Sequence, residues 1–151
     1  MRSKNFSFTP VPQHGWDQSR DFTPLALESA LLTEGYLCFF HEGAETRRCL
    51  FLLEFLIEAK TRLLAHFGSS QFTAKLVLPL SAGNFEIERG GERVSLREAA
   101  TTILSAEYTD FLADFLAFES ELRREMASCF PKMASSWEFA MVFGQNVPPR
   151  A

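Results

Sequence analysis

The chain has 151 residues, of which 46% are apolar and 23% are charged, as expected for one globular domain rather than for a disordered chain. Its formal net charge is −4 and it has no long basic run, which argues against direct nucleic-acid binding because phosphates need neutralising cations. The 16 phenylalanines predict a thick aromatic core, and surplus rings could form a contact surface.

The three cysteines, Cys38, Cys49 and Cys129, show no C-x-x-C spacing, which argues against a disulfide framework or a zinc ribbon. The first ten residues turn polar where a signal peptide needs an apolar core, so none is expected. The most apolar run, 49–57, contains Glu54 and is far shorter than the ~20 residues of a membrane span. We therefore expect a cytoplasmic protein without membrane association.

The expected organisation is one domain between two irregular ends. Residues 1–22 are interpreted as a partly extended arm, in which Phe6 and Phe8 permit a short strand. A single α+β domain is expected over 23–144, followed by a loose tail over 145–151 that contains adjacent prolines.

The first half of this domain predicts two helices around a strand. Thr23-Pro24 is typical of a helix start, and Gly35 is suited to end that helix. The apolar run 36–40 predicts a buried strand with a turn after it at 41–43. Residues 45–67 predict a long helix, buried on more than one side because apolar residues surround its axis.

The next segment predicts a strand at 72–78 and then a hairpin over 85–96 around Gly90-Gly91. This turn sets a register in which every cross-strand pair is complementary by charge or by apolar packing. The expected pairs are Arg89 with Glu92, Glu88 with Arg93, Ile87 with Val94, and Phe85 with Leu96.

The C-terminal third predicts helix and then strand. Ser95 and Glu98 have capping-box spacing, so a helical run is expected over 96–130 with a break near 105–107. Strict alternation over 137–143 predicts a final strand. The predicted fold is α+β: a single mixed or antiparallel sheet of about 4–6 strands packed against 2–3 long helices.

One polar group could carry chemistry. His41, Glu42 and Glu45 resemble a zincin motif only superficially, because the second histidine is absent, and no metal or cofactor is predicted. They could bind a ligand or an anion with Arg47 and Arg48 at the N-terminus of the next helix. Alternatively, the acidic residues only complement the helix dipole.

Two apolar stripes could be either core or interface: Trp137, Phe139, Met141 and Phe143 in the last element, and Tyr108, Phe111 and Phe115 in the helix before it. The acidic charge, the excess of phenylalanine and the missing catalytic motifs favour a non-enzymatic protein–protein interaction module. An acidic inhibitor or immunity protein, an antitoxin or a chaperone-like protein fits this description, with a basic partner or self-association. The alternatives are a small-ligand-binding domain and, less favoured, an enzyme using His41 with Glu42 or Glu45.

Overall fold

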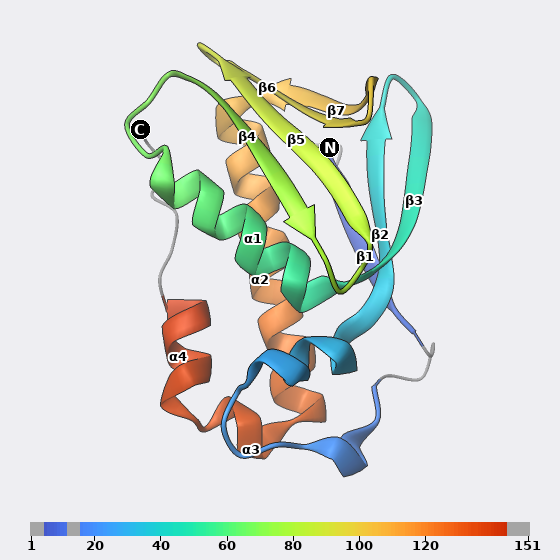
Figure 1. Ribbon diagram of the computed structural model, residues 1–151, viewed down its shortest axis with the longest axis vertical. Helices are drawn as coiled ribbons and strands as arrows, with labels where there is room; N and C mark the ends of the chain where they lie inside the picture. The colour runs from blue at the N-terminus through green and yellow to red at the C-terminus, as the bar shows by residue number, and fades with distance from the viewer. Residues whose placement is uncertain (1–4, 12–15, 145–151) are drawn as a thin grey trace.

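The computed structural model describes residues 5–11 and 16–144, which form two antiparallel sheets and a set of helices (Figure 1). The expected tail at 145–151 and His14 lie outside these residues. In chain order the elements are β1 (Phe6–Pro10), the 3₁₀ helices η1 (Gln18–Arg20) and η2 (Leu27–Thr33), β2 (Glu34–His41), β3 (Ala44–Phe51), α1 (Leu52–Ala65), β4 (Gln71–Leu78), β5 (Gly83–Gly90), β6 (Arg93–Glu98), β7 (Thr101–Glu107), α2 (Tyr108–Cys129), α3 (Pro131–Ala134) and α4 (Trp137–Gly144).

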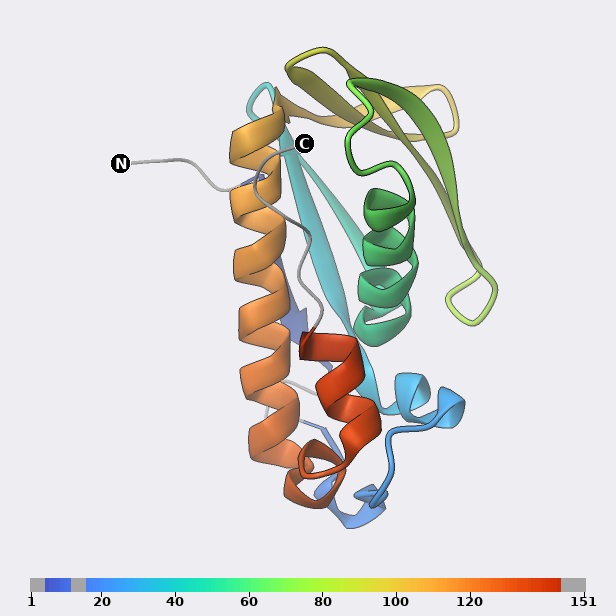
Figure 2. The same cartoon turned by 90° about the vertical axis from the view of Figure 1, so that its left-hand side faces the viewer.

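The α+β class is confirmed, but the single sheet is wrong. The first sheet has the order β1-β2-β3 and the second has the order β4-β5-β6-β7, and every pairing is antiparallel. Of the helices, α1 and α2 are long, whereas α3 and α4 are short. Figure 2 shows α2 running along the length of the molecule, with α4 folded back beside it.

An aromatic core joins the two sheets to the helices, as the phenylalanine content predicts. The Phe39 ring from β2 lies 6.5 Å from Phe6 in β1, 6.0 Å from Phe55 in α1 and 5.7 Å from Phe85 in β5, measured between ring centroids. From α2, Phe118 approaches both Phe6 and Phe55. The core therefore lies where both sheets and both long helices meet.

The first predicted helix is wrong in type and in its end. The chain forms the short 3₁₀ helix η2, and Gly35 lies inside β2. A Cβ atom on Gly35 would lie 2.6 Å from the side chain of Leu52 and 2.9 Å from the backbone oxygen of Thr9. Glycine is therefore needed here for close packing rather than to end a helix. The strand predicted at 36–40 is confirmed within β2.

The helix predicted over 45–67 begins only at Leu52, because Ala44–Phe51 forms β3. The turn predicted at 41–43 is confirmed, and Glu42 and Gly43 adopt φ values of 50° and 79°. A two-residue turn with both φ values positive returns the chain antiparallel to the preceding strand. The residues after it therefore pair with β2 instead of starting a helix.

The strand at 72–78 and the hairpin after it are confirmed, but the hairpin register is wrong. The turn lies at Gly91-Glu92, so that Arg89 faces Val94 and Ile87 faces Leu96. Arg89 is buried, with its guanidinium carbon 3.6 Å from the centroid of the Tyr108 ring. Its Nε also donates to Gly91 O at 2.8 Å. Arg89 therefore lies on the buried face of the second sheet and does not pair with Glu92.

The helical run predicted over 96–130 is correct only from Tyr108 onward. Ser95 and Glu98 belong to β6, and Thr101–Glu107 forms β7, so the predicted capping box does not start a helix. The break expected near 105–107 coincides with the end of β7. Strand pairing has overridden a local helix signal here.

The final strand predicted at 137–143 is also wrong, because these residues form α4. Residues two apart on a helix lie about 200° apart around its axis. The alternating apolar residues therefore divide between two faces of α4. Phe139 and Phe143 are buried, whereas Trp137 and Met141 are exposed.

Candidate functional site

The predicted polar group at the β2–β3 turn is only partly assembled. His41 ends β2, and its Nε2 lies 3.8 Å from the Glu42 carboxylate in the turn. Both residues border an open surface hollow of about 570 Å³. The hollow is lined by Asn5, Ser7, Phe40, His41, Glu42, Gly43 and Ser105. Glu45, Arg47 and Arg48 are absent from this lining, and no helix begins at the turn.

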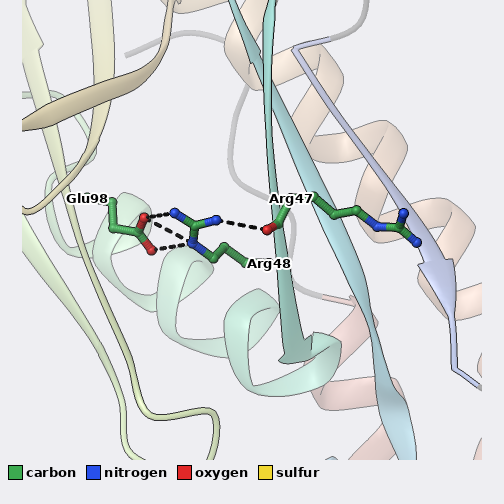
Figure 3. Close-up of polar contacts among 3 residues, drawn as sticks. All are labelled: Arg47, Arg48 and Glu98. Atoms are coloured by element: carbon green, nitrogen blue, oxygen red, sulfur yellow. Dashed lines mark hydrogen bonds and ion pairs between the residues drawn. The ribbon is translucent and has the colours of Figure 1, made fainter.

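Arg47 and Arg48 point to opposite faces of β3, as neighbours on a strand must (Figure 3). Arg48 forms a two-pronged ion pair with Glu98, and its Nε lies 2.9 Å from Glu98 Oε2. Donating hydrogen bonds to the Glu98 carboxylate raises the pKa of the Arg48 guanidinium. Arg47 instead lies 4.0 Å over the Tyr36 ring. The two arginines therefore do not converge on an anion beside His41.

The two thiols of the β2–β3 hairpin, Cys38 and Cys49, both have a raised pKa. Burial, followed by the Glu45 carboxylate, raises the pKa of Cys38. Desolvation and the charge of Glu34 raise the pKa of Cys49. A raised pKa lowers the fraction of thiolate, which is the nucleophilic form. No group of three or more possible metal ligands occurs among residues 5–11 and 16–144.

A second site emerges from the distribution of exposed apolar side chains. In the described part of the chain, the large exposed apolar residues all lie on α1, just after it, or on η2, β4, the turn after β4, or α4. They are Leu27, Leu31, Ile57, Phe67, Val77, Leu80, Trp137 and Met141. Leu27 is 83% exposed, Trp137 66% and Met141 50%.

Specific hydrogen bonds join these elements to α1. Thr33 Oγ1 at the end of η2 accepts from the Leu53 amide at 3.0 Å. On the opposite side, Glu58 accepts from the Val77 amide of β4 at 3.2 Å. Two of the elements that carry exposed apolar side chains, η2 and β4, are therefore bonded directly to α1.

The groove between α1 and α4 is the best-defined part of this surface. It has a volume of about 210 Å³ and is lined by Ile57, Lys60, Thr61, Leu64, Met141 and Val142. Trp137 lies one turn before Met141 on the same face of α4. We call the set Ile57, Leu64, Trp137, Met141 and Val142 the α1–α4 surface.

A buried ion pair forms the base of the α1–α4 groove. Lys60 of α1 pairs with Glu119 of α2, and each side chain is only 6% exposed. Lys60 Nζ also donates to the Val142 carbonyl oxygen of α4 at 2.7 Å. The contacts of Lys60 with Glu119 and with Val142 thus connect three helices.

The predicted interface residues fall into two groups. Trp137 and Met141 are exposed in the α1–α4 surface. The other members of the two stripes, Phe139, Phe143, Tyr108, Phe111 and Phe115, are buried core residues. Sequence reasoning missed Ile57 as a surface residue. Its only signal was a helix with apolar residues around much of its axis, which leaves some of them outside the core.

Comparison with known protein families, with curated proteins and with solved structures finds no match for this chain. Within the residues that the structure describes, no helix is long and apolar enough to cross a membrane. The candidate function therefore depends on the surfaces of the molecule itself.

Proposed function

We propose that the protein is a non-enzymatic interaction module that binds another protein on its α1–α4 surface. The observation that carries this proposal is the groove between α1 and α4, which Ile57, Leu64 and Met141 line, together with Trp137, which is 66% exposed one turn before Met141. Contiguous exposed apolar surface is typical of contact sites, and tryptophan and methionine are enriched at interfaces. A surface tryptophan is also a common energetic anchor of binding.

The groove indicates what such a partner offers. A channel between two helices accepts apolar side chains from one face of a partner helix. The chain carries a formal net charge of −4, which favours a basic partner. Lys60 at its base is already neutralised by Glu119. We therefore propose a partner with apolar side chains flanked by basic ones, as an acidic inhibitor or immunity protein, an antitoxin or a chaperone-like protein would bind.

The test is affinity purification from the native cells with a matched pair of variants. Trp137→Ser/Met141→Ser removes two exposed apolar side chains spaced i,i+4 on α4. Ser120→Ala/Arg124→Lys alters two exposed residues at the same spacing on α2 without changing the net charge. The proposal predicts a stoichiometric partner, identified by mass spectrometry, that the wild type and the α2 variant retain and the α4 variant loses. Recovery of the protein alone, or equal recovery of the partner by all three, contradicts it.

Small-ligand binding in the hollow beside His41 is the second candidate, supported by the size of that hollow and by the half-buried imidazole at its edge. A metabolite panel in a thermal-shift assay tests it. Stabilisation by one compound that is lost in His41→Ala supports it, and flat melting temperatures oppose it. An enzyme using His41 with Glu45 has less support, because Glu45 does not line the hollow.

A further inference from the structure

The outer edge of β3 offers unpaired backbone groups in a regular row. β3 is the last strand of the first sheet. In β2, the Phe40 amide donates to Asn5 O and the Glu34 oxygen accepts from the Val11 amide, so its even-numbered residues bond towards β1. Its odd-numbered residues bond to β3, where their partners are the even-numbered ones.

The odd-numbered residues of β3, Glu45, Arg47 and Cys49, therefore direct their N–H and C=O groups away from the sheet, and all three are exposed. Two contacts agree with this parity. The Phe51 amide donates to the Ser81 hydroxyl at 3.0 Å, outside the sheet. The Arg47 oxygen accepts from the Arg48 guanidinium at 2.9 Å, as Figure 3 shows.

Two other edge strands, β4 and β1, have features that oppose pairing. On β4, the outward Val77 amide is bound by Glu58 of α1. On β1, Phe6, Phe8 and Pro10 are the outward residues, and Pro10 has no N–H to donate. Such devices prevent strand addition. β3 lacks both, because its outward residues include no proline and no helix carboxylate binds their amides.

We propose that two copies of this chain pair antiparallel along β3, about a twofold axis at Thr46, and join their first sheets into one continuous sheet. The sequence of β3 is self-complementary in this register. Glu45 of each copy faces Arg47 of the other, and Thr46 faces itself. Opposite charges and paired threonines across antiparallel strands are both stabilising.

The other twofold registers lack this complementarity. Because only odd-numbered residues bond outward, the axis must pass through a residue rather than between two. An axis at Glu45 or at Arg47 places like charges opposite each other, and an axis at Arg48 places that arginine against itself. An axis at Cys49 leaves Arg47 opposite Phe51. The hydrogen bond that Arg48 donates to the Arg47 carbonyl oxygen is compatible with the Thr46 axis. A carbonyl oxygen accepts two hydrogen bonds, so the Arg47 oxygen can also accept one from the second copy.

Charge exchange tests this interface by sedimentation velocity over a range of concentrations. Glu45→Arg places arginines on both sides, and Arg47→Glu places glutamates on both sides. By symmetry each variant loses two ion pairs and gains two repulsions, so each should weaken the dimer at least tenfold. A 1:1 mixture of the two variants restores both pairs as a heterodimer, and the double variant Glu45→Arg/Arg47→Glu restores them as a homodimer.

A wild-type dimer, monomeric single variants and a dimeric mixture would support the proposal, and recovery in the mixture shows that the variants are folded. A wild type that stays monomeric at every concentration overturns it, as does a dimer that the single variants leave intact. Trp137→Ser/Met141→Ser lies outside β3 and should dimerise normally. A failure of the β3 interface is therefore distinguishable from a failure of partner binding at the α1–α4 surface.

Discussion

Lys60 shows how one buried charge can connect three helices. Its ammonium group is neutralised by Glu119 and also donates to the Val142 oxygen, so α1, α2 and α4 meet at a single atom. Removing two charges from water is costly, and the pair is tolerated only because each group has a partner. The position of Met141 beside the groove therefore depends on an interaction at the base of that groove.

We predict that Lys60→Met destabilises the fold by about 3–5 kcal/mol, because it leaves Glu119 buried without its cation. The double substitution Lys60→Met/Glu119→Leu should recover most of that loss, since no charge then remains unpaired. Urea denaturation followed by circular dichroism measures the free energy of unfolding of the wild type, of Lys60→Met and of the double variant. As a control, Arg62→Met removes the Arg62–Glu58 pair, in which Arg62 is exposed, and should cost under about 1 kcal/mol. Equal losses for Lys60→Met and Arg62→Met would show that the Lys60–Glu119 pair does not hold the helices together.

At the scale of elements, α4 illustrates why alternation in a short segment misleads. Phe139 and Phe143 are spaced i,i+4, and so are Trp137 and Met141. These four side chains would share one face of a strand, but on a helix they form two pairs on two faces. The segment becomes a helix because its first turn is capped through Ser136, whose hydroxyl accepts from the Phe139 amide at 3.2 Å. That serine lay just outside the alternating run.

This arrangement predicts unequal effects of alanine substitutions along α4. Phe139→Ala and Phe143→Ala should each cost about 3–5 kcal/mol of unfolding free energy, because both rings are buried and leave cavities. Trp137→Ala and Met141→Ala should change it by no more than about 0.5 kcal/mol, because their side chains are exposed. Thermal and urea unfolding of the four variants measures the difference. A strand with one buried aromatic face would give four similar losses instead.

The sequence predicts elements well where local signals agree with tertiary pairing. The strands at 36–40 and 72–78 and the turn at 41–43 are bounded by glycine or proline, and the structure confirms them. The passage from strand to helix at Phe51-Leu52 has no such boundary. Long-range pairing of β3 with β2 decides that segment, and a helical reading of 45–67 cannot anticipate it.

For the candidate sites too, the sequence predicts poorly those features that depend on tertiary structure. The exposure of Trp137 and Met141 depends on α4 being a helix, which the alternating pattern concealed. Arg47 and Arg48 were expected to act together beside His41, but they separate onto two faces because β3 is a strand. The α1–α4 groove combines residues more than 70 positions apart, so no local pattern in the sequence could reveal it.

For the molecule as a whole, the division into two sheets raises the question of whether they unfold together. Phe39 of the first sheet contacts Phe85 of the second, and both contact Phe55 of α1. A shared core of this kind couples the two sheets, since neither can lose its partner without exposing the same rings. We therefore expect both sheets, with β1 included, to unfold together with the long helices as one cooperative unit.

Phe39→Ala tests this coupling directly. The substitution should lower the unfolding free energy by about 3–5 kcal/mol, because Phe39 is fully buried among rings from three other elements. Phe67→Ala, at a ring that is half exposed, should cost no more than about 0.5 kcal/mol. In both variants the urea transitions followed by far-ultraviolet circular dichroism and by the fluorescence of buried Trp16 should coincide, because one core supports both sheets. Two separated transitions in Phe39→Ala would mean that each sheet has a core stable on its own, and that the aromatic cluster only brings them into contact.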